Sequence, residues 1–159
     1  MSRKSPYITA EGYDSLKEEL QQLWKKRREV VKALSAAAAE GDRSENAEYI
    51  YRKKQLRELD RRIRYLQKRM PELKVVECRP GNSEKVYFGA WVELEDESGA
   101  SVAYRIVGAD EFDPKRNWIS VDSPMARALL GKALDEEVSV NTPSGRKQWC
   151  ILDVRYSGE

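Results

Sequence analysis

The chain has 159 residues, of which 35% are charged and 40% are apolar, and its formal net charge is +2. This charge content is too high for one thick globular core, and the apolar content is too high for a disordered chain. The absence of histidine excludes histidine general bases and histidine metal sites. The two cysteines, Cys78 and Cys150, lie far apart and have no metal-ligand spacing. Without a signal peptide or a membrane-spanning apolar run, the sequence predicts a soluble, cytoplasmic protein.

The first half of the chain is predicted to be an antiparallel helical hairpin. Apolar residues recur at alternating steps of three and four in two series, from Tyr13 to Leu34 and from Leu56 to Leu73. Arg27 occupies the one core slot that the first series leaves vacant. This spacing is typical of two helices that pack along a coiled-coil seam. The glycine-containing break at residues 40–44 separates the two arms.

The ends of the two arms have recognisable signals. Thr9 precedes the first series and predicts a helix cap, while Pro71 predicts that the second helix ends near Arg69 or Met70. Small residues at Ala36–Ala39 allow the arms to approach closely before the break. An arm of about 30 residues is about 45 Å long, so the hairpin is predicted to carry its tip far from the rest of the chain.

The second half changes to a period of two, which indicates strands separated by turns. A short helix is predicted from Ser123-Pro124 to Leu130, with Gly131 as its stop. The fold class is therefore α+β: a coiled-coil hairpin at 1–75, with an acidic tip at 41–49, and a small antiparallel-sheet domain at 76–159. The predicted strands are Val86–Leu94, Val102–Val107, Trp118–Val121, Glu137–Asn141 and Gln148–Tyr156.

The tip of the hairpin concentrates acidic residues and has two interpretations. Asp42 and Glu45 have the spacing of a capping box, in which Asp42 caps the second helix and no chemistry follows. Alternatively, these carboxylates, with Asn46 and Glu48 nearby, are hard oxygen ligands of the kind that Mg²⁺ accepts. Two carboxylates do not enclose an ion, so the tip would bind Mg²⁺ well only beside a second metal site and a nucleic acid.

The second arm carries many more cations than anions. Its only acidic residues in the basic stretch are Glu58 and Asp60. A solvated helix face is one explanation, and a polyanion-binding face is the other. Tyr49 and Tyr51 could stack on a base, although Tyr49 also falls on the extrapolated seam. The basic residues are Arg52, Lys53, Lys54, Arg57, Arg61, Arg62, Arg64, Lys68 and Arg69.

Two separated motifs resemble the Gre family of bacterial transcript cleavage factors. They are GDRSENAEY at residues 41–49 and DSPMARALL at residues 122–130, and they occur in the family's order. Taken alone, the second motif predicts only a short helix with an N-terminal cap. Arg43-Ser44, the basic second arm and Asn141-Thr142-Pro143 resemble the GreB branch more than the GreA branch.

The resemblance implies a fold, a partner and a set of functional residues. The C-terminal domain would be FKBP-like and would dock on the rim of the RNA polymerase secondary channel through Asp122, Ser123, Pro124 and Met125. The hairpin would enter the channel, where Asp42 and Glu45 would hold a Mg²⁺ shared with the polymerase and promote cleavage of the 3′ end of backtracked RNA.

The resemblance also implies that the chain is a monomer that lends ligands to the polymerase and is not an enzyme by itself. Asn46, Glu48 and Tyr49 would support the tip. The predicted contacts to the extruded RNA are Arg52, Lys53, Lys54, Arg57 and Arg61.

Three other functions remain compatible with the sequence. A regulator that binds the same channel without stimulating cleavage is the nearest alternative. A peptidyl-prolyl isomerase would need a deep aromatic-lined pocket, because a fold alone does not carry a function. For a plain coiled-coil adaptor, replacing Asp42 or Glu45 with alanine would cost only a helix cap, about 1 kcal/mol.

Overall fold

A computed structural model of the chain describes residues 4–40, 46–77 and 84–156. The chain divides into two compact units. Tyr13–Glu72 form the first, which we call the hairpin unit, and Met1–Gly12 together with Leu73–Glu159 form the second, the sheet unit. The predicted α+β class, a helical hairpin with a small sheet domain, is confirmed.

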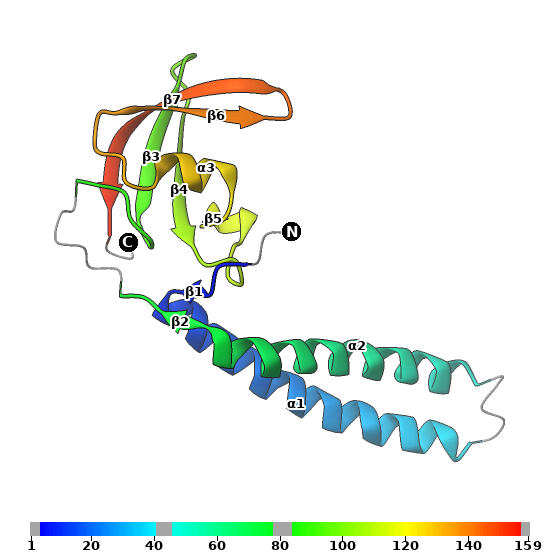
Figure 1. Ribbon diagram of the computed structural model, residues 1–159. Coiled ribbons are helices and arrows are strands. Elements are labelled where there is room, and N and C mark those ends of the chain that lie inside the picture. The colour runs from blue at the N-terminus through cyan, green and yellow to red at the C-terminus, as the bar shows by residue number, and fades with distance from the viewer. Residues whose placement is uncertain (1–3, 41–45, 78–83, 157–159) are drawn as a thin grey trace. The chain divides into compact units, whose positions relative to one another are not determined.

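The hairpin unit contains helix α1 (Ala10–Ala38) from Tyr13 onward, helix α2 (Ala47–Arg69) and the 3₁₀ turn η1 (Met70–Glu72). Figure 1 shows α1 and α2 running side by side in opposite directions. Members of both apolar series are buried, as the alternating spacing predicts: Leu16, Val30, Ile63, Leu66 and Met70. No helix in the described ranges is long and apolar enough to cross a membrane.

Two ion pairs join the helices of the hairpin unit. Arg27, at the vacant slot of the apolar series, donates from Nε to Asp60 Oδ1 at 2.7 Å. Arg62 donates from Nε and from its terminal nitrogen to the two carboxylate oxygens of Glu19, at 2.7 and 2.9 Å. A bidentate arginine–carboxylate pair fixes geometry better than a single contact. The pairs therefore help to define the register of the two arms, in the half of α2 that also contains the buried Ile63 and Leu66.

The predicted helix ends are partly right. Gly12 N donates to Thr9 Oγ1 at 3.0 Å, so Thr9 caps α1 as expected. The second helix ends at Arg69, also as expected. The prediction that Asp42 caps the second helix is wrong, because α2 begins at Ala47 and its N-cap is Asn46. The side chain of Asn46 accepts the Tyr49 N–H, so a cap is present four residues later than predicted.

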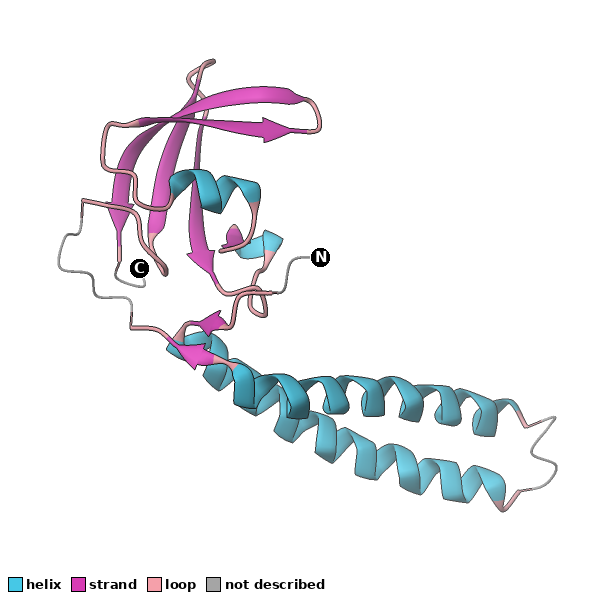
Figure 2. Cartoon of the chain, viewed as in Figure 1, coloured by secondary structure: helices cyan, strands magenta, loops and turns pink. Residues whose placement is uncertain are grey.

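A five-stranded sheet forms the centre of the sheet unit, with strand order β5-β4-β3-β7-β6. All neighbouring strands are antiparallel except β4 and β5, which are parallel. Figure 2, where strands are magenta, shows the long β6–β7 hairpin beside β3. The strands are β3 (Trp91–Asp96), β4 (Ser101–Val107), β5 (Trp118–Ser120), β6 (Glu137–Thr142) and β7 (Gly145–Arg155).

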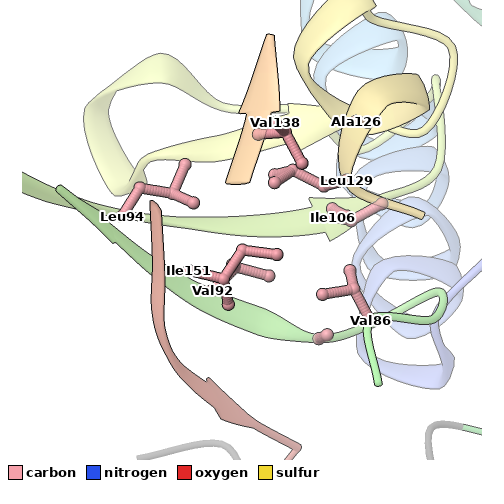
Figure 3. Packing of buried hydrophobic residues seen from close by; sticks show 9 residues of the cluster. Val86, Val92, Leu94, Ile106, Ala126, Leu129, Val138 and Ile151 are labelled. Atoms are coloured by element: carbon pink, nitrogen blue, oxygen red, sulfur yellow. The ribbon is translucent and has the colours of Figure 1, made fainter. Parts of the chain in front are cut away.

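The core of this unit lies between the sheet and helix α3 (Pro124–Leu129). Figure 3 shows side chains from β3, β4, β6 and β7 meeting Ala126 and Leu129 of α3. The alternation along each strand directs every second side chain into this core, which is why a period of two predicted these strands. The fully buried members of largest volume are Leu94, Ile106, Leu129 and Ile151.

One predicted strand is too long. Val86–Leu94 was expected to be a single strand, but β3 begins only at Trp91. Gly89 has φ = 89°, in the left-handed region, and Ala90 N bonds back to Tyr87 O, so a turn precedes the strand. Val86 and Ala90 are nonetheless completely buried in the core. The apolar run therefore predicts correctly that Val86 and Ala90 are buried, but wrongly that residues 86–94 all form one strand.

The beginning of the chain is built into the sheet unit. Strands β1 (Tyr7–Ile8) and β2 (Lys74–Val75) pair in parallel. The carboxylate of Glu111 accepts the Thr9 N–H at 2.8 Å, the Thr9 hydroxyl at 2.5 Å and the Gly108 N–H at 2.8 Å. A short two-stranded sheet is marginal alone. The Glu111 carboxylate therefore provides much of the attachment of this segment.

Candidate functional site

The two carboxylates predicted to be catalytic, Asp42 and Glu45, lie outside the described residues. The described chain resumes at Asn46, which is half-buried and closes the end of the hairpin. Its Nδ2 donates to the Ala37 carbonyl at 2.7 Å while its Oδ1 accepts the Tyr49 N–H at 3.1 Å. Asn46 thus links the last turn of α1 to the first turn of α2. Of the small residues predicted to let the arms approach, Ala37 is buried at 3% exposure, whereas Ala36 and Ala39 are exposed.

The other two predicted tip residues have distinct surroundings on α2. Glu48 Oε1 accepts from Arg52 Nε at 2.8 Å, one helical turn further along. Tyr49 is half-buried, and the Lys53 ammonium lies 5.8 Å from its ring centroid. The position of Tyr49 on the seam and its partial burial favour packing over base stacking. Both residues therefore have partners within α2.

No group of three or more acidic or cysteine side chains that could hold a metal ion occurs in the ranges described. Of the two described carboxylates on either side of residues 42 and 45, Glu48 is engaged by an arginine and Glu40 is exposed. A Mg²⁺ at this end of the hairpin would therefore depend mainly on the carboxylates of residues 42 and 45.

The basic residues of α2 fall into two groups. Arg52 and Arg62 are held by carboxylates within the hairpin unit, at Glu48 and Glu19. The second group is exposed apart from the half-buried Arg69, and its exposed members form no ion pair with a described residue. Five of them recur at steps of three and four and define what we call the cationic stripe: Lys54, Arg57, Arg61, Arg64 and Lys68.

The spacing of the cationic stripe places it on one face of α2. Its members are out of phase with the buried Ile63 and Leu66, because the two series are displaced by about 150° around the helix axis. Lys53 is also exposed and lies at the edge of the same face. The described structure therefore separates a packing face of α2 from a solvent face on which the five cations of the stripe outnumber the exposed Glu58.

The predicted docking residues surround the start of α3. Ser123 is its N-cap and accepts the Ala126 N–H at 3.2 Å, while the exposed Pro124 takes the first helical position. Met125 is half-buried and packs against the core. Asp122 accepts the Ser5 N–H at 2.8 Å and also the Ser5 hydroxyl.

A surface cavity of about 440 Å³ borders this loop, with Ser123 on its wall. Phe112, at 57% exposure, and Trp118 contribute aromatic surface to it. The guanidinium groups of Arg105 and Arg116 lie 4.9 and 5.0 Å from the Trp118 ring centroid. The sequence did not identify this cavity, because its residues come from separate strands and turns with no common motif.

Comparisons with known proteins match both halves of the chain. The family described as "Transcription elongation factor, N-terminal" matches residues 6–75, and "Transcription elongation factor, GreA/GreB, C-term" matches residues 81–156.

Curated relatives carry the name "Transcription elongation factor GreB". The Yersinia pestis protein is 56% identical over 96% of this chain and 90% of its own length. The protein of Pseudomonas aeruginosa strain PAO1 is 58% identical over 96% and 91%. The Haemophilus influenzae protein is 61% identical over 89% of this chain and 90% of its own length.

Proposed function

Since the chain belongs to the GreA/GreB family of transcription elongation factors, and to its GreB branch as the motifs predicted, we propose that it stimulates cleavage of backtracked RNA. In this proposal it binds RNA polymerase at the rim of the secondary channel. It then presents the hairpin tip to the polymerase active centre. The observation that carries the proposal is the exposed, internally unpaired cationic stripe on the helix that directly follows the two predicted carboxylates.

Docking is assigned to the loop at Asp122–Met125. Its exposed part is Pro124, which the Ser123 cap holds at the first position of α3. Met125 supports the loop from the core side, and Asp122 is braced by Ser5. A loop fixed on three sides loses little conformational freedom on binding, which favours its use as a rigid recognition element.

The chemistry is assigned to Asp42 and Glu45, which would complete the coordination of a Mg²⁺ shared with the polymerase. Such an ion lowers the pKa of a bound water and orients it for attack on a phosphodiester. Asn46 then acts as a support, because it fixes the start of α2 immediately after Glu45 and ties it to Ala37. The chain would act as a donor of ligands, with the polymerase as the nuclease.

The extruded RNA is assigned to the solvent face of α2. Lys53, Lys54, Arg57 and Arg61 are exposed and would contact successive phosphates. Arg52 is less available to RNA than these four residues, because its guanidinium already donates to Glu48 and Gln55. Holding the RNA fixes which phosphodiester lies at the active centre, and hence where cleavage occurs.

The test is RNA release from a stalled, backtracked elongation complex in Mg²⁺. We expect the wild-type chain to shorten the RNA rapidly from its 3′ end. The Asp42→Ala/Glu45→Ala variant should bind the polymerase but not stimulate cleavage. A matched control, Asp14→Ala/Glu18→Ala, removes two exposed carboxylates elsewhere on the hairpin and should cleave like the wild type.

Two outcomes would contradict the proposal. Binding of the wild-type chain without any stimulation of cleavage would leave the alternative of a regulator that occupies the channel. Full activity in the Asp42→Ala/Glu45→Ala variant would show that the catalytic ligands lie elsewhere.

A further inference from the structure

Two large apolar side chains are exposed side by side at the start of α2. Ile50 is 53% exposed and Tyr51 is 59% exposed. Isolated exposed apolar residues are ordinary. These two, however, adjoin each other on a helix whose solvent face is otherwise charged, and Lys54 lies one turn beyond both of them.

The structure distinguishes Tyr51 from Tyr49. Residues two apart on a helix are separated by about 200°, so the two rings leave α2 on opposite sides. Tyr49 is half-buried at the seam, whereas Tyr51 faces solvent. Only Tyr51 therefore offers its ring to a ligand on the outer face of the hairpin unit.

A chain of contacts holds the Tyr51 ring from one side. The Arg52 guanidinium lies 5.4 Å from the ring centroid. Arg52 is itself fixed by Glu48 Oε1 at 2.8 Å and by Gln55 Oε1 at 3.0 Å. An arginine over a tyrosine ring is a favourable cation–π contact. The arrangement limits the freedom of the ring before any ligand binds.

We propose that Tyr51, braced by Arg52 and flanked by Ile50, is a stacking platform for an unpaired base of single-stranded RNA. The cationic stripe next to it supplies phosphate contacts for the same strand. An exposed aromatic ring beside a row of cations is the combination that binds single strands without sequence preference, because every base has a π-face. The inference rests on the proposed function, in which the strand is the RNA extruded by backtracking.

The charge of the surroundings favours RNA over a protein partner as the occupant. Lys54, Arg57 and Arg61 continue along the exposed face from the platform, and none of them pairs with a described carboxylate; the exposed Glu58, two turns beyond Tyr51, is the acid among them. Successive members of this row are about 5–6 Å apart, close to the repeat of a single-stranded backbone. An apolar protein surface would leave these cations without partners.

The experiment measures binding of the full chain to a short single-stranded oligouridylate that carries one 2-aminopurine, across a range of salt concentrations. Stacking quenches the 2-aminopurine fluorescence. Tyr51→Ala should lose the quenching and weaken affinity by about 5- to 150-fold, while Tyr51→Phe should resemble the wild type. The matched control is Tyr87→Ala, which removes an exposed tyrosine from the sheet unit and should change neither quantity.

The salt dependence of the affinity for the oligonucleotide distinguishes the contribution of base stacking from that of phosphate contacts. Tyr51→Ala should leave the slope of log affinity against log salt unchanged, because it removes no cation. Arg57→Ala should reduce the slope by about 0.7, the value for one phosphate contact on a single strand. Equal affinity of Tyr51→Ala and wild type would overturn the proposal. So would a Tyr51→Ala variant that binds RNA normally and polymerase weakly, since Tyr51 would then contact protein.

The same variants in the cleavage assay keep the two proposals apart. If the wild type cleaves backtracked RNA while Tyr51→Ala binds the oligonucleotide normally, the stacking platform is wrong and the cleavage function stands. If the wild type does not cleave, the cleavage function is wrong, and the oligonucleotide measurement still decides whether Tyr51 stacks on a base.

Discussion

The carboxylate of Glu111 provides a direct test of how the start of the chain is held in the sheet unit. It accepts two backbone N–H groups and one hydroxyl, and Thr9, which supplies two of these donors, is only 1% exposed. A hydrogen bond to a charged group contributes about 1.5–3 kcal/mol, and the contributions of one cluster do not add fully. Glu111→Ala, which leaves the Thr9 donors buried and unpaired, should therefore lower the free energy of unfolding by about 3 kcal/mol.

Glu111→Gln should be much milder. The amide oxygen can still accept the two N–H groups, and the amide nitrogen can donate to the Thr9 hydroxyl, so the main loss is charge, about 1 kcal/mol. Urea denaturation in a Trp24→Phe background measures both variants, since all remaining tryptophans belong to the sheet unit. Glu97→Ala, at an exposed turn, is the control and should stay within about 0.5 kcal/mol of wild type. Equal losses for Glu111→Ala and Glu111→Gln would refute this account.

Three further changes test local features of the sheet unit. Gly108→Ala would place its Cβ 2.0 Å from the Tyr7 carbonyl oxygen, so denaturation should show a loss of about 2–4 kcal/mol; a loss below about 1 kcal/mol would contradict the close approach. Ser123→Ala removes the cap of α3 and should cost about 1 kcal/mol, measured in the same way; no change would mean that solvent replaces the cap. Hydrogen bonding from the Ser98 hydroxyl, the largest cause, lowers the pKa of Asp96, so NMR titration of Ser98→Ala should show that pKa rising toward its ordinary value. The stability that this bond provides is present above the unfolded pKa and is lost as pH falls through the lowered folded pKa, so the variant and wild type should converge in acid.

The sequence predicted the elements that depend on local periodicity. The two helices follow from apolar steps of three and four, and α3 follows from a serine cap, a proline at the first position and a glycine stop. The alternation in β4 and β6 likewise predicted both strands nearly to the residue. In each case the interactions that select the conformation lie within one turn or one strand, so they leave a pattern in the sequence.

Features that depend on distant partners were missed. Strands β1 and β2 have two residues each, too few for any period, and they exist because segments more than 60 positions apart meet. Glu111 lies in a turn, and its sequence context does not distinguish it from an exposed acid until the fold brings Thr9 to it. The strand predicted from Val86 failed because Gly89 can adopt a left-handed conformation that a pattern of apolar residues does not reveal.

In the candidate site, too, the sequence predicted features that depend on nearby residues and missed those that depend on distant ones. The sequence identified a surplus of cations on α2 but did not show that Arg62 is engaged, because its partner carboxylate, Glu19, lies on α1, 43 positions away. The sequence assigned Asn46 to the support of the tip, and that role stays a prediction; the described structure adds that Asn46 caps α2 and bonds to α1. The assignment of Asp42 and Glu45 stays a prediction.

The distribution of burial along α2 explains why Asn46 matters for the far end of the hairpin. The buried residues of α2 are Ile63 and Leu66, both in the half that leads to η1. The half that begins at Ala47 contains no fully buried side chain, so apolar burial cannot fix its position by itself. Segments with few buried contacts open most readily. The hydrogen bond from Asn46 to the Ala37 carbonyl and the buried Ala37 side chain therefore provide much of what holds α1 and α2 together at this end of the hairpin. Ala37 and Asn46 lie on either side of the predicted carboxylates in the sequence.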